Sequence, residues 1–546
     1  METLSNNDKE IIADCNELMP NEKEENENNI VLSKNCRTKN SARNIATGLL
    51  LRIICLLIPF IIRTIIIKKL GLDYLGLNSL FASILQVLSL SELGFSTSIA
   101  FSMYKPIQEN NIPLVCALLK FLRKIYLIVG CVILGAGLLL MPFLRYLING
   151  DYPADINLYI LYSIYLFNTV ISYFLFSHKS VLLAASQRSD IENNITIFSF
   201  IGMYILQIIV LLLFANYYIY IIFLPISTLA INIIREIICN KKYPQYKSIG
   251  ELSKEKKKEI NAHVRSFVGH RLSLTIVSST DSIFISAFLG LSILAIYQNY
   301  YFIVSSLIAF ISILYTSITA SVGNSLVTDT ADKNYNDFKK LTFLNVWIVG
   351  WMSICFICLA QHFMILWVGE ENLLPLLSVV LMLIYFYTWK FKDMLCVYKD
   401  AAGLWKIDFW KPYVVSVLNM ILDFVLVYYY GVNGALIATI VSVPIVSLPW
   451  ETNTFFKAYF KRSPLKYYLR LLIYSIAVLC VGILTYFVCY LLPGDGYLWF
   501  GLKLVICLGL PNTLFLLMSF WMPEFKWVWH KTLSIFRRKK KNKENI

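Results

Sequence analysis

The sequence predicts an all-α membrane protein with about 14 transmembrane helices. Of its 546 residues, 58% are hydrophobic and only 15% are charged, which is too apolar a composition for a soluble domain. Apolar runs of about 20 residues, long enough to cross a bilayer as a helix, recur from residue 45 to residue 521. Together these two observations predict a chain that crosses the membrane many times.

The distribution of basic residues supports an even number of spans. The expected spans are approximately 45–67, 75–103, 125–144, 156–177, 191–214, 217–238, 264–289, 293–320, 342–360, 373–389, 412–430, 433–456, 471–491 and 499–521. With this assignment, 40 of the 49 Lys and Arg residues lie in the two tails and in connections on one side, against three on the other side. Because positive charge marks the cytoplasmic side, both termini are expected in the cytoplasm. The net charge of +15 therefore reflects topology and does not indicate a nucleic-acid partner.

Changes in polarity along the chain predict its domain organisation. The expected segments are a disordered cytoplasmic tail (1–43), an N-terminal six-helix bundle (44–239), a cytoplasmic linker (240–263), a C-terminal six-helix bundle (264–460), two additional transmembrane helices (461–523) and a basic cytoplasmic tail (524–546). From Ser253 onward the linker has a helix-forming composition. It is expected either to lie on the membrane surface or to be a solvated connection.

The two halves of the chain carry a weak internal repeat. "LGLDYLGLN" at 70–78 aligns with "LGLSILAIY" at 289–297, and the same offset of 219 residues sets Arg52 against Arg271. Repeated bundles are typical of secondary transporters, in which the substrate binds where the repeats meet. The sequence therefore predicts two pseudo-symmetric six-helix bundles around a central cavity, with the two C-terminal helices outside the repeat.

The first span contains two arginines, which are costly in hydrocarbon. Arg52 and Arg63 are eleven residues apart, so they share a helix face and lie roughly 16 Å apart along the axis. Pro59 between them is expected to bend the helix. Arg63 is near the outer end, where reaching the interface is an equally good interpretation, whereas Arg52 is roughly 10 Å deep.

Other charged residues also fall within the expected spans. The seventh span contains Arg265, His270, Arg271 and Asp281, and it is expected to line a wet interior, although an ion pair that fixes packing is the alternative. Two further carboxylates, Glu92 and Asp423, can either take part in ion coupling or neutralise an arginine. We interpret Arg235 with Glu236, and also Glu451, as interfacial groups.

The sequence shows no motif for metal, nucleotide or covalent chemistry. Most of the 12 cysteines stand singly in apolar runs, where cysteine acts as a small hydrophobic residue. We interpret Cys355 and Cys358 as helix packing, because no second pair or histidine cluster accompanies them. There is no Walker loop, His-Glu metal pair or nucleophile elbow. We therefore expect a transporter and not an enzyme, with no metal and no cofactor.

The stretch 61–107, with "YLGLNSLF", "LSLSELGFSTSI" and "YKPI" in order, resembles bacterial polysaccharide flippases of the O-antigen and capsule type. These belong to the multidrug/oligosaccharidyl-lipid/polysaccharide (MOP) exporter superfamily. "AAGL" at 401–404 and "YYYGVNGALIATIVS" at 428–442 resemble the second half of the same proteins. The resemblance implies two bundles arranged as a V and alternating access driven by an H⁺ or Na⁺ gradient.

The resemblance also implies a substrate, partners and a location. The substrate would be an undecaprenyl-diphosphate-linked oligosaccharide, flipped across the inner membrane for O-antigen, capsule or exopolysaccharide synthesis. Membrane lipids, a polymerase and a chain-length regulator would be partners. The expected diphosphate ligands are Arg52, Arg271, Arg63 and Arg265. The expected ion-coupling residues are Asp281, Glu92, Asp423 and His270.

Three other functions remain open on the sequence. A multidrug extruder or a peptidoglycan-precursor flippase would belong to the same superfamily. A membrane assembly protein without transport activity would belong to a different class. Arginines in the cavity disfavour organic cations as substrates, and an assembly protein leaves the polar seventh span unexplained.

Overall fold

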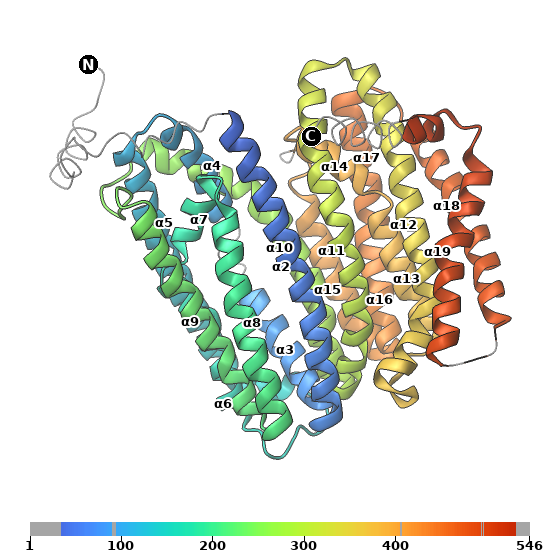
Figure 1. Cartoon of the computed structure of the whole chain (residues 1–546), viewed down its shortest axis with the longest axis horizontal. Helices are drawn as coiled ribbons and strands as arrows, with labels where there is room; N and C mark the ends of the chain where they lie inside the picture. The colour runs from blue at the N-terminus through green and yellow to red at the C-terminus, as the bar shows by residue number, and fades with distance from the viewer. Residues whose placement is uncertain (1–33, 90–93, 405–406, 493, 495, 531–546) are drawn as a thin grey trace, which may run out of the picture. The chain divides into compact units, whose positions relative to one another are not determined.

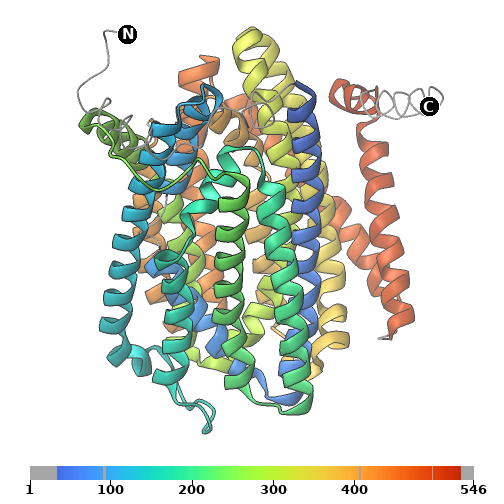
Figure 2. The same ribbon diagram turned by 60° about the vertical axis from the view of Figure 1, so that its left-hand side comes forward.

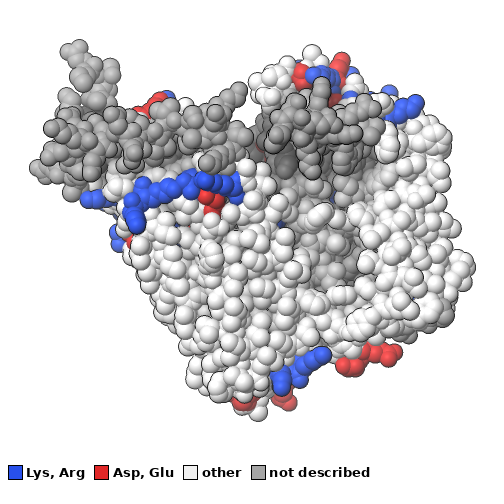
Figure 3. All heavy atoms as spheres, viewed as in Figure 1, with Lys and Arg blue, Asp and Glu red and all other residues white. Residues whose placement is uncertain are grey.

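The computed structural model describes residues 34–89, 94–404, 407–492, 494 and 496–530, and within them it confirms the predicted all-α class. Every regular element in these residues is helical, and none is a strand (Figure 1). Helices satisfy their own backbone hydrogen bonds, which the interior of a bilayer demands. On the face in Figure 3, charged side chains gather at the two ends of the helices, with uncharged ones between.

The chain divides into two compact units, residues 1–295 and 296–546. The first unit contains α2 (Lys34–Lys69), α3 (Leu72–Leu88), α4 (Phe95–Gln108), α5 (Ile112–Leu140), η3 (Met141–Leu147), α6 (Leu158–Phe174), α7 (His178–Ala185), α8 (Ser189–Leu213), α9 (Tyr217–Lys242), α10 (Lys254–Leu289) and the start of α11 (Leu291–Thr328). Within it, α3 packs against α10, and α8 packs against both α2 and α9.

The second unit holds the rest of α11 and the helices that follow. These are α12 (Ala331–Val368), η4 (Glu370–Asn372), α13 (Leu376–Lys390), α14 (Asp393–Ala401), α15 (Lys411–Tyr430), α16 (Val432–Ile440), η5 (Val441–Ser447), α17 (Leu448–Phe455), η6 (Phe456–Phe460), α18 (Leu465–Tyr490) and α19 (Tyr497–Ser519). In Figures 1 and 2, α18 and α19 lie side by side, and both also pack against α12.

Eleven helices of the described residues are long and apolar enough to cross a membrane, or twelve if α6 and α7, which meet at 54°, form one bent span. The chain is therefore a multi-pass membrane protein, but the predicted count of 14 is not confirmed. The predicted span 75–103 corresponds to two helices, α3 and α4, and the span 373–389 to the short helix α13. Gly94, with φ of 98°, begins α4 in the left-handed region, which interrupts the second span.

The succession of helices supports the internal repeat. Helices α2 and α10 each have 36 residues, and α3 and α11 each begin directly after a glycine of positive φ. These glycines, Gly71 (φ 112°) and Gly290 (φ 93°), are 219 residues apart. Arg52 and Arg271 both precede their glycine by 19 residues, so they occupy equivalent backbone positions. That the two bundles surround a central cavity stays a prediction.

The predicted linker 240–263 is a packed part of the first unit. Helix α9 continues to Lys242, and α10 begins at Lys254, where Ser253 Oγ accepts the Lys256 N–H (3.3 Å). Tyr243 and Tyr246 are buried in the apolar core formed with α5 and α7. The helix-forming stretch from Ser253 is the first part of α10, which runs on into the seventh span without a break.

Both predicted tails are shorter than the polarity of the sequence suggests. Helix α2 begins at Lys34, ten residues before the expected start of the first bundle at residue 44. Residues 523–530 are also helical, and the ring of Phe525 stacks on Trp347 of α12 (5.8 Å). Most of the N-terminal tail and the end of the C-terminal tail lie outside the described residues.

Candidate functional site

Helix α2 carries the two arginines predicted to bind the diphosphate in the first span. Its polar end is fixed to α8, since Asn44 donates to the Gln187 carbonyl (3.1 Å) and Asn193 donates to Thr47 (3.0 Å). Arg52 is exposed on the first unit, in a helix that remains continuous through Pro59. Arg63 is half-buried close to the Tyr220 hydroxyl of α9. The two arginines therefore have different surroundings, and only Arg52 presents an accessible cation.

The polar face of α10 is packed inside the first unit. Asp281 is 6% exposed, and Ser279, Ser282 and Ser286 are fully buried. The Ser279 hydroxyl donates to the Gln86 side-chain carbonyl of α3 (3.3 Å). Within the first unit, α3 packs against this part of the seventh span, and that the span lines a wet interior stays a prediction.

The predicted ion-coupling residues are distributed over both units. Asp281 belongs to the first unit, whereas Asp423 is fully buried in α15 of the second unit. The remaining predicted residues of the seventh span and Glu92 fall outside the described side chains. Arg265, His270 and Arg271 lie on α10 with side chains outside the described residues, and Glu92 lies wholly outside them.

A tyrosine network that the sequence analysis missed ties three helices of the first unit together. Tyr74 of α3 donates to Asp155 (2.5 Å), and Tyr165 of α6 donates to Asn78 (2.6 Å). Tyr217 of α9 lies 3.1 Å from the Tyr165 hydroxyl and donates to the Tyr74 carbonyl (3.2 Å). Buried hydroxyl groups need such partners, and satisfied networks of this kind fix helices rigidly.

A lysine cluster (Lys392, Lys399, Lys411, Asp408 and Glu451) lies buried where α14, α15 and α17 meet. Glu451 accepts from Lys392 (2.8 Å), Lys399 (3.2 Å) and Lys411, and Asp408 accepts from Lys399 (2.7 Å). Although burial lowers the pKa of Lys399, Glu451, Cys396 and Asp408 raise it well above its ordinary value. Glu451 is thus the centre of a buried ion network and not an interfacial group.

The first unit has an ion pair at the equivalent place, with the charges exchanged. Arg235 of α9 donates from Nε to Glu192 of α8 (2.8 Å), and a second bond joins the same two groups. In the second unit, α15 supplies the cation Lys411 and α17 supplies the carboxylate Glu451. Glu192 and Lys411 are 219 residues apart, and Arg235 and Glu451 are 216 apart. Each pair joins the corresponding two helices of its own bundle.

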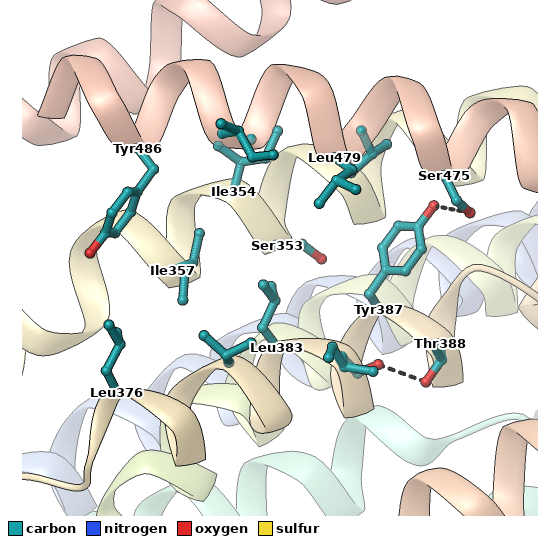
Figure 4. A pocket seen from close by; sticks show the side chains of 15 residues that line it. Ser353, Ile354, Ile357, Leu376, Leu383, Tyr387, Thr388, Ser475, Leu479 and Tyr486 are labelled. Carbon is teal, nitrogen blue, oxygen red and sulfur yellow. Dashed lines mark hydrogen bonds between the residues drawn. The ribbon is translucent and has the colours of Figure 1, made fainter. Parts of the chain in front are cut away.

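An apolar cavity of about 500 Å³ opens between α12, α13 and α18 (Figure 4). Most of its wall is Ile, Leu and Val. Its hydroxyl groups are largely turned to protein partners, since Tyr387 bonds Ser475 (2.9 Å) and Thr388 donates to the Ile384 carbonyl (2.6 Å). The cavity therefore suits a hydrocarbon chain better than a polar ligand.

No family model and no curated protein matches this sequence. Solved structures do match. The lipid II flippase MurJ in an inward closed conformation is 16% identical, with a TM-score of 0.62, covering 87% of this chain and 98% of that one. An inward-facing multidrug resistance MATE transporter of the MOP superfamily is 13% identical, with a TM-score of 0.59. This match covers 72% of this chain and 93% of that one. A MOP superfamily transporter from Pyrococcus furiosus, described as having a binding pocket of reverse polarity, is 13% identical, with a TM-score of 0.52. This match covers 78% of this chain and 97% of that one.

The chain has the fold of the MOP superfamily transporters. This confirms the resemblance noted for 61–107 at the level of the superfamily fold. The identities lie far below the range in which substrates carry over, so the polysaccharide subfamily stays a prediction. The matched structures are described as transporters and a flippase.

The MOP fold also brings together cysteines that looked isolated in the sequence. The sulfur atoms of Cys358, Cys489 and Cys507 all lie within 4.8 Å of one another, and all three side chains are buried. We had interpreted the cysteine pair of α12 as packing because no second pair accompanied it. The partners come from α18 and α19, more than 130 residues later, and no local spacing could reveal them.

Proposed function

We propose that this chain is a flippase that moves an undecaprenyl-diphosphate-linked oligosaccharide across the cytoplasmic membrane by ion-coupled alternating access. The observation that carries the proposal is Arg52, an exposed guanidinium within the long apolar stretch of a membrane-length helix. A charge at this depth costs about 2.5–3.5 kcal/mol on insertion scales, so its retention argues for a function. Arginine binds phosphate oxygens through two parallel hydrogen bonds, which matches an anionic lipid headgroup.

Two further features support a lipid-linked anion as the substrate. The repeat gives Arg52 an equivalent in Arg271, so the two repeated helices α2 and α10 each carry one arginine at the same distance from a glycine. The cavity between α12, α13 and α18 offers apolar walls that suit part of a long isoprenoid chain. A diphosphate joined to a lipid needs both kinds of surface, whereas an organic cation would be repelled by the arginines.

The proposal is tested by single substitutions of the two equivalent arginines. We expect Arg52→Ala and Arg271→Ala each to lower transport of the lipid-linked oligosaccharide at least tenfold, because each removes a charge-assisted contact worth about 1.5–3 kcal/mol. Transport is measured in proteoliposomes, as the fraction of labelled substrate that becomes accessible to an added glycosidase. Lys69→Ala is the matched control, since it removes an exposed cation at the end of the same helix.

The outcomes separate the proposed function from its rivals. Unchanged transport in both arginine variants, with normal insertion of the protein, contradicts the diphosphate role. If the arginine variants lose transport of lipid II but keep transport of a lipid-linked polymer repeat unit, the result favours a peptidoglycan-precursor flippase. Export of organic cations that survives Arg52→Ala favours a multidrug extruder.

A further inference from the structure

Three thiols from three helices converge inside the second unit. Cys358 on α12, Cys489 on α18 and Cys507 on α19 are 3%, 3% and 0% exposed. The sulfur atoms of Cys489 and Cys507 are 3.8 Å apart, and all three lie within 4.8 Å of one another. A metal–sulfur bond of about 2.3 Å places thiolates around a tetrahedral ion about 3.8 Å apart. One pair already has this spacing, and the third sulfur needs to move by no more than about 1 Å.

A proline holds one of these cysteines in place. Pro511 lies four residues after Cys507 in α19 and has no N–H, so the Cys507 carbonyl loses its helical hydrogen bond. Two donors from α12 take that carbonyl instead, Trp351 Nε1 (3.0 Å) and Cys355 Sγ (3.5 Å). The backbone at Cys507 is thereby fixed against α12, which points to a defined site in preference to loose packing of small side chains.

A buried cation accompanies the three thiols. Lys503 lies one helical turn before Cys507, is 2% exposed, and has its ammonium 2.5 Å from Nε2 of His362. His362 in turn lies one turn after Cys358. When Lys503 is protonated, its ammonium donates to a neutral imidazole, and the pair carries one positive charge. A buried positive charge one helical turn from Cys507 favours an anionic neighbour.

The geometry points to a soft-metal site in which Cys358, Cys489 and Cys507 bind one Zn²⁺ ion as three thiolates, or one Cu⁺ ion as two thiolates and one thiol. Thiolates select these ions, which prefer tetrahedral or trigonal sulfur ligands. Three thiolates and Zn²⁺ sum to one negative charge, and so do two thiolates, one thiol and Cu⁺. Lys503 neutralises either complex. The displaced thiol protons pass to solvent and no electron is transferred. The bound ion clamps α18 and α19 onto α12, independently of which substrate is transported.

Metal retention by the full-length protein tests the site. The reduced chain in lipid nanodiscs is mixed with one equivalent of Zn²⁺ or Cu⁺, passed over a chelating resin and analysed for metal by mass spectrometry. We expect about one ion per chain, and at least a tenfold loss in the triple variant Cys358→Ser, Cys489→Ser and Cys507→Ser. Cys480→Ser is the matched control, because Cys480 is an exposed cysteine on the same helix, α18.

Two further measurements do not depend on folding of the triple variant. Lys503→Met keeps the side-chain volume and removes the charge, and we expect it to weaken metal affinity about 10- to 100-fold. In the native chain, bound metal should slow maleimide labelling of the three buried cysteines and leave Cys131 and Cys480, which are exposed, unchanged. The proposal is overturned if the native chain retains no more metal than the triple variant, if Cys480→Ser loses as much metal, or if Cys489 and Cys507 form a disulfide under reducing conditions.

Discussion

Among single residues, Glu451 has the most demanding surroundings in the second unit. Its carboxylate accepts from three buried lysines, none of which has an exposed side chain. Removing one member of a buried ion network leaves the others uncompensated, and this penalty exceeds the net stability that the intact network provides. The burial of Glu451 therefore argues for a fixed geometry more than for added stability.

We expect Glu451→Gln to destabilise the second unit by about 3–5 kcal/mol, because the three lysines that donate to Glu451 lose its negative charge and stay buried. The thermal unfolding midpoint of the purified protein measures this. Glu370→Gln, at an exposed carboxylate, should leave the midpoint unchanged. A midpoint for Glu451→Gln equal to that of the native chain would show that water reaches the cluster and solvates the lysines.

Nothing local in the sequence reveals this cluster. Lys392 and Glu451 are 59 residues apart, and each alone resembles an interfacial charge at the end of a span. The same holds for Arg235 and Glu192, which are 43 residues apart. Arg52 is different, because a charge in the middle of a long apolar run is visible without tertiary structure. A functional residue can therefore be predicted when its charge contrasts with the apolar residues around it in the sequence. It cannot be predicted when two charged residues at the ends of spans come into contact only through folding.

At the scale of elements, α3 and the start of α11 approach each other closely at Gly76. A Cβ added to Gly76 of α3 would lie 2.3 Å from the Leu291 carbonyl oxygen at the start of α11, where no side chain can give way. We expect Gly76→Ala to lower the unfolding midpoint and to separate the two helices. Gly202→Ala is the control, since a Cβ there meets nothing within 4 Å. Equal midpoints for the two variants would contradict the close contact.

The ends of the helices are the part of the fold that the sequence predicts least well. Apolar length predicted the long helices α8, α9 and α15 close to their observed bounds, whereas α5 begins at Ile112, well before the predicted start at residue 125. It also merged α3 and α4 into one span, although α3 ends at Leu88 and α4 begins only at Phe95, after the left-handed Gly94. Helix α10 shows the converse error. Its charged first half looked like a linker, yet it continues the helix, because lysine and glutamate form helices well outside the bilayer.

At the scale of the whole molecule, the repeat is the feature that sequence and structure share most fully. Nine aligned residues suggested it, and two 36-residue helices followed by glycines of positive φ support it. The exchanged charges of the Arg235–Glu192 and Lys411–Glu451 pairs indicate that the two copies kept the helix contact while its chemistry diverged. Contacts within each bundle were thus retained independently of sequence identity, which explains why similarity of fold extends further than similarity of sequence.

The orientation of the chain is the last prediction at this scale. Because 40 of the 49 Lys and Arg residues fall on one side of the expected topology, both termini should be cytoplasmic. A green fluorescent protein fused after Ile546 should therefore fluoresce, and alkaline phosphatase at the same place should be inactive. The same reporters inserted after Asp151, in the exposed connection before α6, should give the reverse pattern. Active phosphatase at the C-terminus would mean an odd number of spans, and one of the short helices α3, α4, α7 or α13 would then not contribute to a crossing.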